Sequence, residues 1–83
     1  MTKLEEKLIE LGYEIYHKDN YSIIWNKDYL VYELKIQIIN DKIFQSYIKS
    51  MNYLFFTQTH IDNLQQAFNE MQKDLEVLRQ CYE

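Results

Sequence analysis

The sequence predicts a single α+β domain over residues 1–83, in the order helix, four-stranded antiparallel meander, long helix (αββββα). The hydrophobic pattern is helical over residues 3–11, has a two-residue period from Tyr13 onward, and becomes helical again after residue 59. A hydrophobic content of 47% favours a folded chain. A length of 83 residues is too short for two domains that each bury a core. We expect both helices to pack on one face of the sheet.

The first helix is expected to begin at a capping box. Thr2 supplies a hydroxyl at the N-cap, and Glu5 follows three residues later, so each side chain can bond the backbone of the other residue. The apolar residues that follow have helical spacing: Leu4, Leu8 and Leu11. Gly12 comes next, where a left-handed C-cap costs least because glycine lacks Cβ. The helix is therefore expected to end at Leu11.

Four strands are expected in the middle of the chain, where β-branched and aromatic residues gather in runs separated by Asp and Asn. The runs cover residues 13–17, 21–25, 29–39 and 43–49. Turns are expected at residues 19–20, 26–28 and 40–41. The third strand alternates most regularly, and its predicted core face consists of Leu30, Tyr32, Leu34, Ile36 and Ile38. Residues 50–56 are compatible with either a short fifth strand or a connection into the core.

The last helix is expected to have Thr59 as its N-cap and to run to about Tyr82. Its apolar residues recur three and four positions apart, which is the spacing of a heptad seam. They are Ile61, Leu64, Phe68, Met71, Leu75, Leu78 and Tyr82. One interpretation is that this seam covers the sheet as the main core helix. The other is that a helix about 36 Å long overhangs strands of about 20 Å.

An overhang would expose apolar surface near the C-terminal end of this helix, where the apolar stripe is widest. Self-association as a homodimer would cover that surface. The residues predicted to mediate it are Met71, Leu75, Val77, Leu78, Cys81 and Tyr82.

The sheet face directed away from the helices is expected to bind a partner. Alternation along the third strand leaves aromatic and β-branched side chains on that face. Exposed aromatic surface on a small domain often marks an interaction site. The residues predicted to contact the partner are Trp25, Tyr29, Val31 and Tyr47. The alternative is that they are singly exposed aromatic and apolar residues without a common role.

The charge of the chain limits the classes of ligand. A formal net charge of -4 argues against general nucleic-acid binding, although Lys35, Lys49 and Tyr47 could together contact stacked bases. Sequestration of a small nucleotide signal stays open, since it needs only a few cations and one stacking ring. A third alternative is an acidic nucleic-acid mimic, formed by Glu5, Glu6, Glu10, Glu70, Asp74, Glu76 and Glu83.

No catalytic, cofactor or metal site is expected. One cysteine, Cys81, and two histidines, His17 and His60, are too few for a Cys/His zinc site. No nucleophile motif or phosphate-binding loop accompanies the histidines. The lone cysteine favours a reducing compartment, and the sequence shows no signal peptide and no apolar run long enough to span a membrane. We therefore expect a non-enzymatic cytoplasmic protein.

The order of the elements, together with the run FTQTHIDNL at residues 56–64, resembles small proteins encoded by phages and prophages of AT-rich bacteria. An abundance of Lys, Ile, Asn and Tyr agrees with such a genome. The resemblance implies a non-enzymatic protein that binds and inhibits a host protein, such as an anti-CRISPR or another anti-defence protein. It assigns no role to any individual residue.

Overall fold

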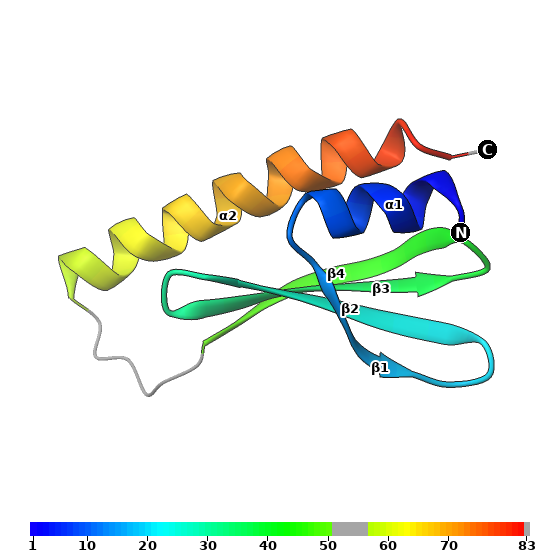
Figure 1. Cartoon of the computed structure of the whole chain (residues 1–83). Helices are drawn as coiled ribbons and strands as arrows, with labels where there is room; N and C mark the ends of the chain where they lie inside the picture. Colours follow the sequence, from blue (N-terminus) through cyan, green and yellow to red (C-terminus); the bar gives the residue numbers. More distant parts are fainter. Residues whose placement is uncertain (51–56, 83) are drawn as a thin grey trace.

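The computed structural model describes residues 1–50 and 57–82, which form a four-stranded antiparallel sheet with two helices on one face (Figure 1). The elements, in chain order, are α1 (Lys3–Glu10), β1 (Glu14–Lys18), β2 (Ser22–Tyr29), β3 (Tyr32–Ile39), β4 (Lys42–Ser50) and α2 (Gln58–Arg79). The strands pair in sequence order, β1-β2-β3-β4, so β1 and β4 are the edge strands. The predicted αββββα class is confirmed. The prediction for residues 51–56 falls outside the described residues.

The start and the end of α1 are as predicted. The Thr2 hydroxyl accepts a hydrogen bond from the Glu5 N–H at 3.1 Å, and the Glu5 carboxylate accepts one from the Thr2 N–H at 3.3 Å. Leu11 is the C-cap, and Gly12 has a φ of 97°, in the region that glycine favours. The predicted capping box and glycine stop are therefore confirmed.

The turn between β2 and β3 differs from the prediction. A turn was expected at residues 26–28, but β2 continues through them to Tyr29, and the chain reverses at Leu30, whose φ is 55°. The polar residues fit inside the strand because each has a partner: Asn26 bonds Lys35, and Lys27 bonds acids of α2. Tyr29 consequently pairs directly with Tyr32.

The hairpin between β3 and β4 forms as expected. Asn40 and Asp41 both adopt positive φ, 52° and 61°, which suits a two-residue turn. A register shift opposite Gln37 and Ile38 leaves Phe44 as an extra residue in β4. A similar shift in β1 makes Tyr16 the extra residue. Each edge strand of the sheet thus carries one bulge.

The N-cap of α2 is Thr57 and not Thr59. Thr57 has an extended backbone, and its hydroxyl accepts a hydrogen bond from the His60 N–H at 3.2 Å. Thr59 follows inside the first turn of the helix. The predicted N-cap, Thr59, is therefore wrong by two residues.

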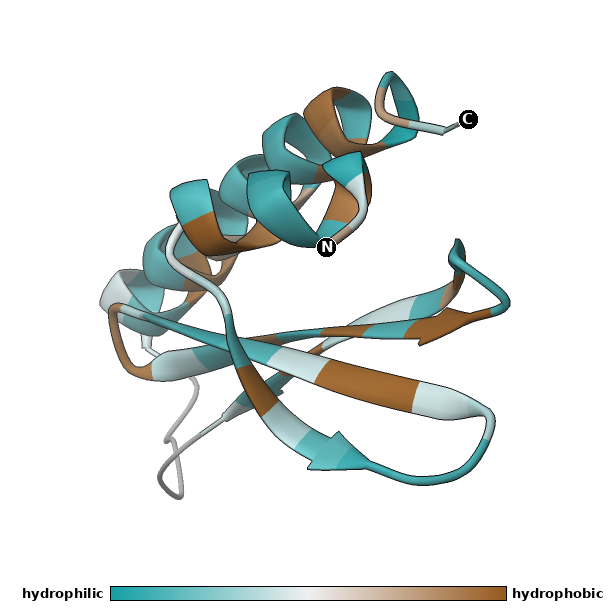
Figure 2. Cartoon of the chain, turned by 45° about the vertical axis from the view of Figure 1, so that its right-hand side comes forward, coloured by the Kyte–Doolittle hydropathy of each residue, from teal (hydrophilic) through white to brown (hydrophobic). Residues whose placement is uncertain are grey.

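The core lies between the helices and the sheet, and Figure 2 shows hydrophobic segments in both layers. Leu4 and Leu8 of α1 and Leu34 and Ile36 of β3 are among its buried residues. The C-terminal half of α2 adds further buried side chains: Met71, Leu75 and Leu78. This half of α2 is covered because α1 packs beside it (Figure 1).

The predicted overhang therefore occurs at the opposite end of α2. In its N-terminal half, Ile61, Leu64 and Phe68 are 50%, 45% and 50% exposed. The lengths of the strands and of α2 indicate that part of α2 extends past the sheet, but they do not show which end of α2 is covered by α1. The prediction that Met71, Leu75 and Leu78 form a self-association surface is wrong, because the chain buries all three in its own core. Val77 and Cys81 are half-buried, and Tyr82 is exposed.

Candidate functional site

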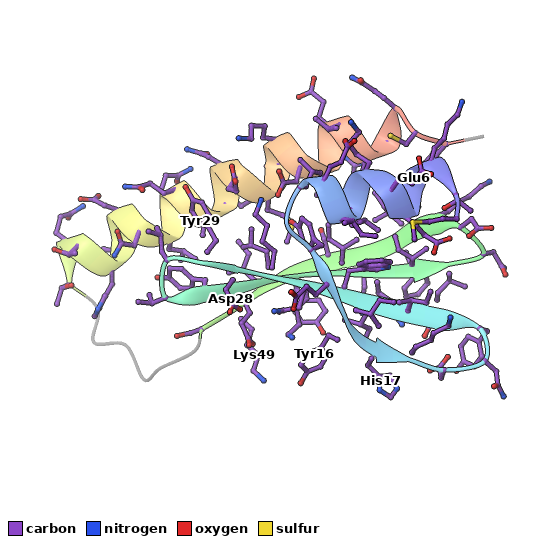
Figure 3. All side chains as sticks on the ribbon, viewed as in Figure 1. Glu6, Tyr16, His17, Asp28, Tyr29 and Lys49 are labelled. Carbon is purple, nitrogen blue, oxygen red and sulfur yellow. The ribbon has the colours of Figure 1, made fainter. Side chains whose placement is uncertain are left out.

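The candidate site is the sheet face opposite the helices, called the open face below. Both helices lie on the other side of the sheet, and Figure 3 shows Tyr16, His17, Asp28 and Lys49 directed away from them. Cross-strand pairing arranges the residues of β2, β3 and β4 on this face in three rows. The rows are Ile24, Gln37 and Gln45; Asn26, Lys35 and Tyr47; and Asp28, Glu33 and Lys49. β1 adds Glu14, which pairs with Asn26, together with Tyr16 and His17.

A buried lysine occupies the centre of the open face. The Lys35 residue is only 2% exposed, although its side chain lies on the face that no helix covers. Its ammonium donates to the Asn26 side-chain oxygen at 3.1 Å and lies 3.7 Å from the Glu33 carboxylate. Asn26 in turn donates to Asp28 at 3.2 Å. A buried ammonium needs such partners, because an unpaired one would pay a large desolvation cost.

Tyr16 covers this lysine. The Lys35 nitrogen lies 3.4 Å from the centre of the Tyr16 ring, the geometry of a cation–π contact. The bulge at Tyr16 places its ring on the open face beside Lys35, and the residue remains 59% exposed. The contact holds an exposed aromatic ring in a defined position. A partner that packs on this ring would therefore lose little side-chain entropy.

Tyr47 forms the other aromatic part of the open face. It pairs with Lys35 from the β4 side and is 40% exposed. Gln45 and Gln37 form a neighbouring amide pair, with the Gln45 nitrogen donating to the Gln37 oxygen at 2.9 Å. The open face therefore combines two exposed rings with polar side chains that hydrogen-bond one another.

Of the four predicted partner-binding residues, only Tyr47 lies on the open face. Trp25 is 3% exposed and belongs to the core on the helix side. Tyr29 lies on the side of α2 in Figure 3, and Val31 packs against the core from the turn. The predictions for Trp25, Tyr29 and Val31 are wrong because the strand boundary at Tyr32 and the displaced turn put these residues on the other side. The predicted apolar face is in fact polar around its two tyrosines.

The sequence reasoning missed Tyr16 and the partners of Lys35. The cross-strand row of Asn26, Lys35 and Tyr47 follows from the Asn40–Asp41 hairpin once the position of the preceding turn is known. The place of Tyr16 depends on a bulge, for which the sequence carries no signal such as a glycine.

A second polar cluster lies inside the protein, between α2 and the sheet. Lys27 of β2 donates to Asp74 at 2.9 Å and to Glu70 at 3.1 Å, and the Tyr13 hydroxyl donates to Asp74 at 2.9 Å. The Asp74 side chain is completely buried, and its Oδ1 atom has no partner among the described residues. Burial, followed by the charge of Asp74, raises the pKa of the Tyr13 hydroxyl, which therefore stays a donor. This cluster ties α2 to the sheet.

The buried cluster changes the prediction of an acidic surface. Asp74 is inside the protein, and Glu70 is paired with both Lys27 and Lys73. These two acids are therefore not available to an outside partner, which contradicts the proposed role of Asp74 in an acidic mimic. Lys35 is similarly engaged by Asn26, Glu33 and Tyr16, so its charge is not offered to a nucleotide phosphate.

The two histidines lie far apart in the fold. His17 is on the open face, 4.0 Å from Asp19, whereas His60 is in the first turn of α2. Within residues 1–50 and 57–82, no group of three His, Cys, Asp or Glu side chains is placed to hold a metal ion. Neither described helix has the length and apolar character needed to cross a membrane.

Comparison with known proteins identifies no relative of this chain. No protein-family model matches it, and no curated protein or solved structure shows significant similarity to it. The geometry of the open face is therefore the feature of this chain that points to a function.

Proposed function

We propose that this chain is a non-enzymatic binding protein that uses its open face to bind and inhibit a host protein in the cytoplasm. The observation that carries the proposal is the Tyr16 ring held over the buried Lys35. The partner class comes from the resemblance to small phage and prophage proteins, whose expected action is stoichiometric binding. Inhibition would follow from occupying a surface that the host protein needs.

The open face has the composition of an interaction surface. Tyrosine is enriched among residues that dominate binding energy, and such residues lie at the centre of a contact with polar neighbours around them. Tyr47 belongs to the row that contains Lys35, the Tyr16 ring lies against the Lys35 ammonium, and Asn26, Gln37 and Gln45 are their polar neighbours. An antiparallel sheet can leave one face in water without any function. Contact with water alone, however, does not explain why the Tyr16 ring is held against the buried ammonium of Lys35.

A protein fits this surface better than a small nucleotide does. Among the residues of the three rows, the exposed cation is Lys49, at the margin of the open face, since the ammonium of Lys35 is already bonded. A face with two exposed rings and several amides instead offers many contacts to a protein surface. The acids Asp28 and Glu33 lie beside Lys49, which disfavours a phosphate at that position.

Affinity capture from a bacterial lysate, followed by mass spectrometry, tests the proposal. Wild-type protein should enrich a defined host protein in a stoichiometric complex, and a Tyr16→Ala, Tyr47→Ala double variant should lose it. Tyr21→Ala is the matched control, because Tyr21 is 71% exposed and lies in the turn between β1 and β2, outside the open face. Equal enrichment by the double variant and the control would contradict the proposal.

A nucleotide screen separates this proposal from the earlier alternative. A ligand that binds the folded state raises the melting temperature by linkage. Cyclic and linear nucleotides at about 1 mM should leave the transition unchanged. A nucleotide that stabilises the wild type but not the Lys49→Met variant would instead support signal sequestration.

A further inference from the structure

A second surface lies on the helix side of the sheet, between the edge strand β4 and the overhanging N-terminal half of α2. The apolar side chains of this part of α2 and Ile48 of β4 line a groove of about 370 Å³, called the edge groove below. Its lining residues are Ile48, Ile61, Leu64, Gln65 and Phe68. From this arrangement we infer that the edge groove binds an extended strand of another protein, which pairs with β4 and places apolar side chains under α2.

The backbone of β4 supports strand addition. As the last strand of the sheet, β4 directs the N–H and C=O groups of alternate residues away from β3. At the hairpin end, the Ile43 N–H donates a hydrogen bond to the Tyr82 hydroxyl at 3.0 Å. From Gln45 to Ile48, no described residue outside β3 is bonded to the backbone of the strand. An extended peptide satisfies such groups with its own backbone, whereas a helix does not.

The edge groove supplies the side-chain specificity. A strand that extends a sheet directs every second side chain to the same face. The strand added beside β4 would direct these side chains toward Leu64 and Phe68, which are half exposed in the chain alone. A volume of about 370 Å³ is within the range of small ligand pockets, roughly 300 to 1,000 Å³. The bound strand should therefore be apolar at alternate positions.

The charges of β4 indicate which charges the bound strand should carry. β4 carries Lys42 near one end and Lys49 near the other, and it contains no acidic residue. No carboxylate of the described residues lies within 4.0 Å of either ammonium, although the whole chain has a net charge of -4. A strand with acidic residues near its ends would complement both lysines. A second copy of β4 would bring two more lysines and no acid, so we assign the groove to a different protein.

The other edge of the sheet lacks these features. β1 has five residues, all of them exposed, and the bulge at Tyr16 interrupts the middle of the strand. Bulges and short length protect an edge from pairing. In β4 the bulge lies close to the hairpin, and the pairing from Gln45 onward is regular. β4 therefore offers the longer uninterrupted edge of the two.

A designed peptide tests this inference without knowledge of the natural partner. The probe is a fluorescent nine-residue peptide of alternating Val and Thr with a Glu at each end, titrated in a polarisation assay. Binding to the wild type is expected, and Leu64→Ser and Phe68→Ser should each weaken it about tenfold or more. Gln66→Ser, on an exposed part of the same helix, is the control and should leave binding unchanged.

Two further peptides isolate the backbone and charge contributions. Methylation of alternate backbone nitrogens removes donors but keeps the side chains, so it should abolish binding to the wild type. A peptide with Lys in place of Glu should bind poorly to the wild type and regain affinity for the Lys42→Glu, Lys49→Glu variant. No binding of the Glu peptide up to about 1 mM, or equal binding of its methylated form, would overturn the inference.

The result is separable from that for the open face. Tyr16→Ala should bind the peptide like the wild type, since Tyr16 lies in β1 at the opposite edge of the sheet and does not line the edge groove. Sedimentation of the wild type with and without the peptide tests whether a second copy occupies the groove. A wild-type dimer that the peptide dissociates would show that it does, and would overturn the assignment to a different protein.

Discussion

Replacing Lys27 with Met removes the only described cation that contacts Asp74. In the wild type, the Lys27 ammonium lies 2.9 Å from an Asp74 carboxylate oxygen and 3.1 Å from Glu70. Methionine has a similar length and an apolar stem, so the packing of the side chain is largely kept. The substitution leaves the Tyr13 hydroxyl as the remaining described donor to a completely buried carboxylate.

The expected loss of stability is large. Breaking a buried ion pair by removing one partner costs about 3 to 5 kcal/mol, because a buried charge is left uncompensated. A domain of this size has roughly 4 to 12 kcal/mol of total stability. At about 4 °C or more per kcal/mol, the melting temperature should fall by at least about 12 °C.

Urea unfolding of the two proteins, followed by the fluorescence of the buried Trp25, measures this cost. A Lys27→Met, Asp74→Asn double variant is the matched comparison, since the amide keeps an acceptor for Tyr13 but carries no charge. The double variant should be more stable than Lys27→Met alone. A cost below about 1 kcal/mol for Lys27→Met, or a double variant less stable than the single one, would refute the reasoning about the buried charge.

Three other experiments test separate parts of the fold. The Lys73 ammonium, more than Lys27, holds the pKa of Glu70 below its usual value of 4.5. The ionised Glu70 carboxylate therefore stabilises the fold above that pH, and this stabilisation should be lost as the pH falls through the lowered pKa. Urea titrations between about pH 6 and 3 should show a smaller loss of stability for Lys73→Met than for the wild type. Leu78→Ala should cost about 2 to 5 kcal/mol, whereas Phe68→Ala, half exposed, should cost less than about 1 kcal/mol in the same assay. If the chain forms a homodimer, Phe68→Asp should weaken it in sedimentation experiments, because Phe68 and not Leu78 is the exposed part of the seam; a dimer insensitive to Phe68→Asp would contradict this.

Local sequence signals predicted those features that depend on a few neighbouring residues. The Thr2 and Glu5 capping box, the stop at Gly12 and the Asn40–Asp41 hairpin each follow from side chains that act on the adjacent backbone. Alternation in β3 also identified its buried core residues correctly, namely Tyr32, Leu34, Ile36 and Ile38. The prediction for Leu30 is wrong, because Leu30 lies in the turn before β3 and is half exposed. The order of the six elements follows from these signals and from the change of hydrophobic period.

The features that the sequence reasoning missed depend on contacts between distant segments. The polar residues at positions 26–28 suggested a turn, but Lys27 is accommodated in β2 by acids more than 40 positions away, which pattern reasoning does not detect. The exposed end of α2 depends on where α1 packs. The ring of Tyr16 reaches Lys35 only because β1 carries a bulge. The contact between Tyr16 and Lys35 therefore could not be predicted without the tertiary structure.

The dissociation constant of the captured host protein tests the central claim most directly. Measured by calorimetry, Tyr16→Ala should weaken binding about thirtyfold, the effect of losing a central tyrosine worth about 2 kcal/mol. Tyr21→Ala should bind like the wild type. If Tyr16→Ala and Tyr21→Ala both retain wild-type affinity while remaining folded, the open face is not the surface that binds the partner.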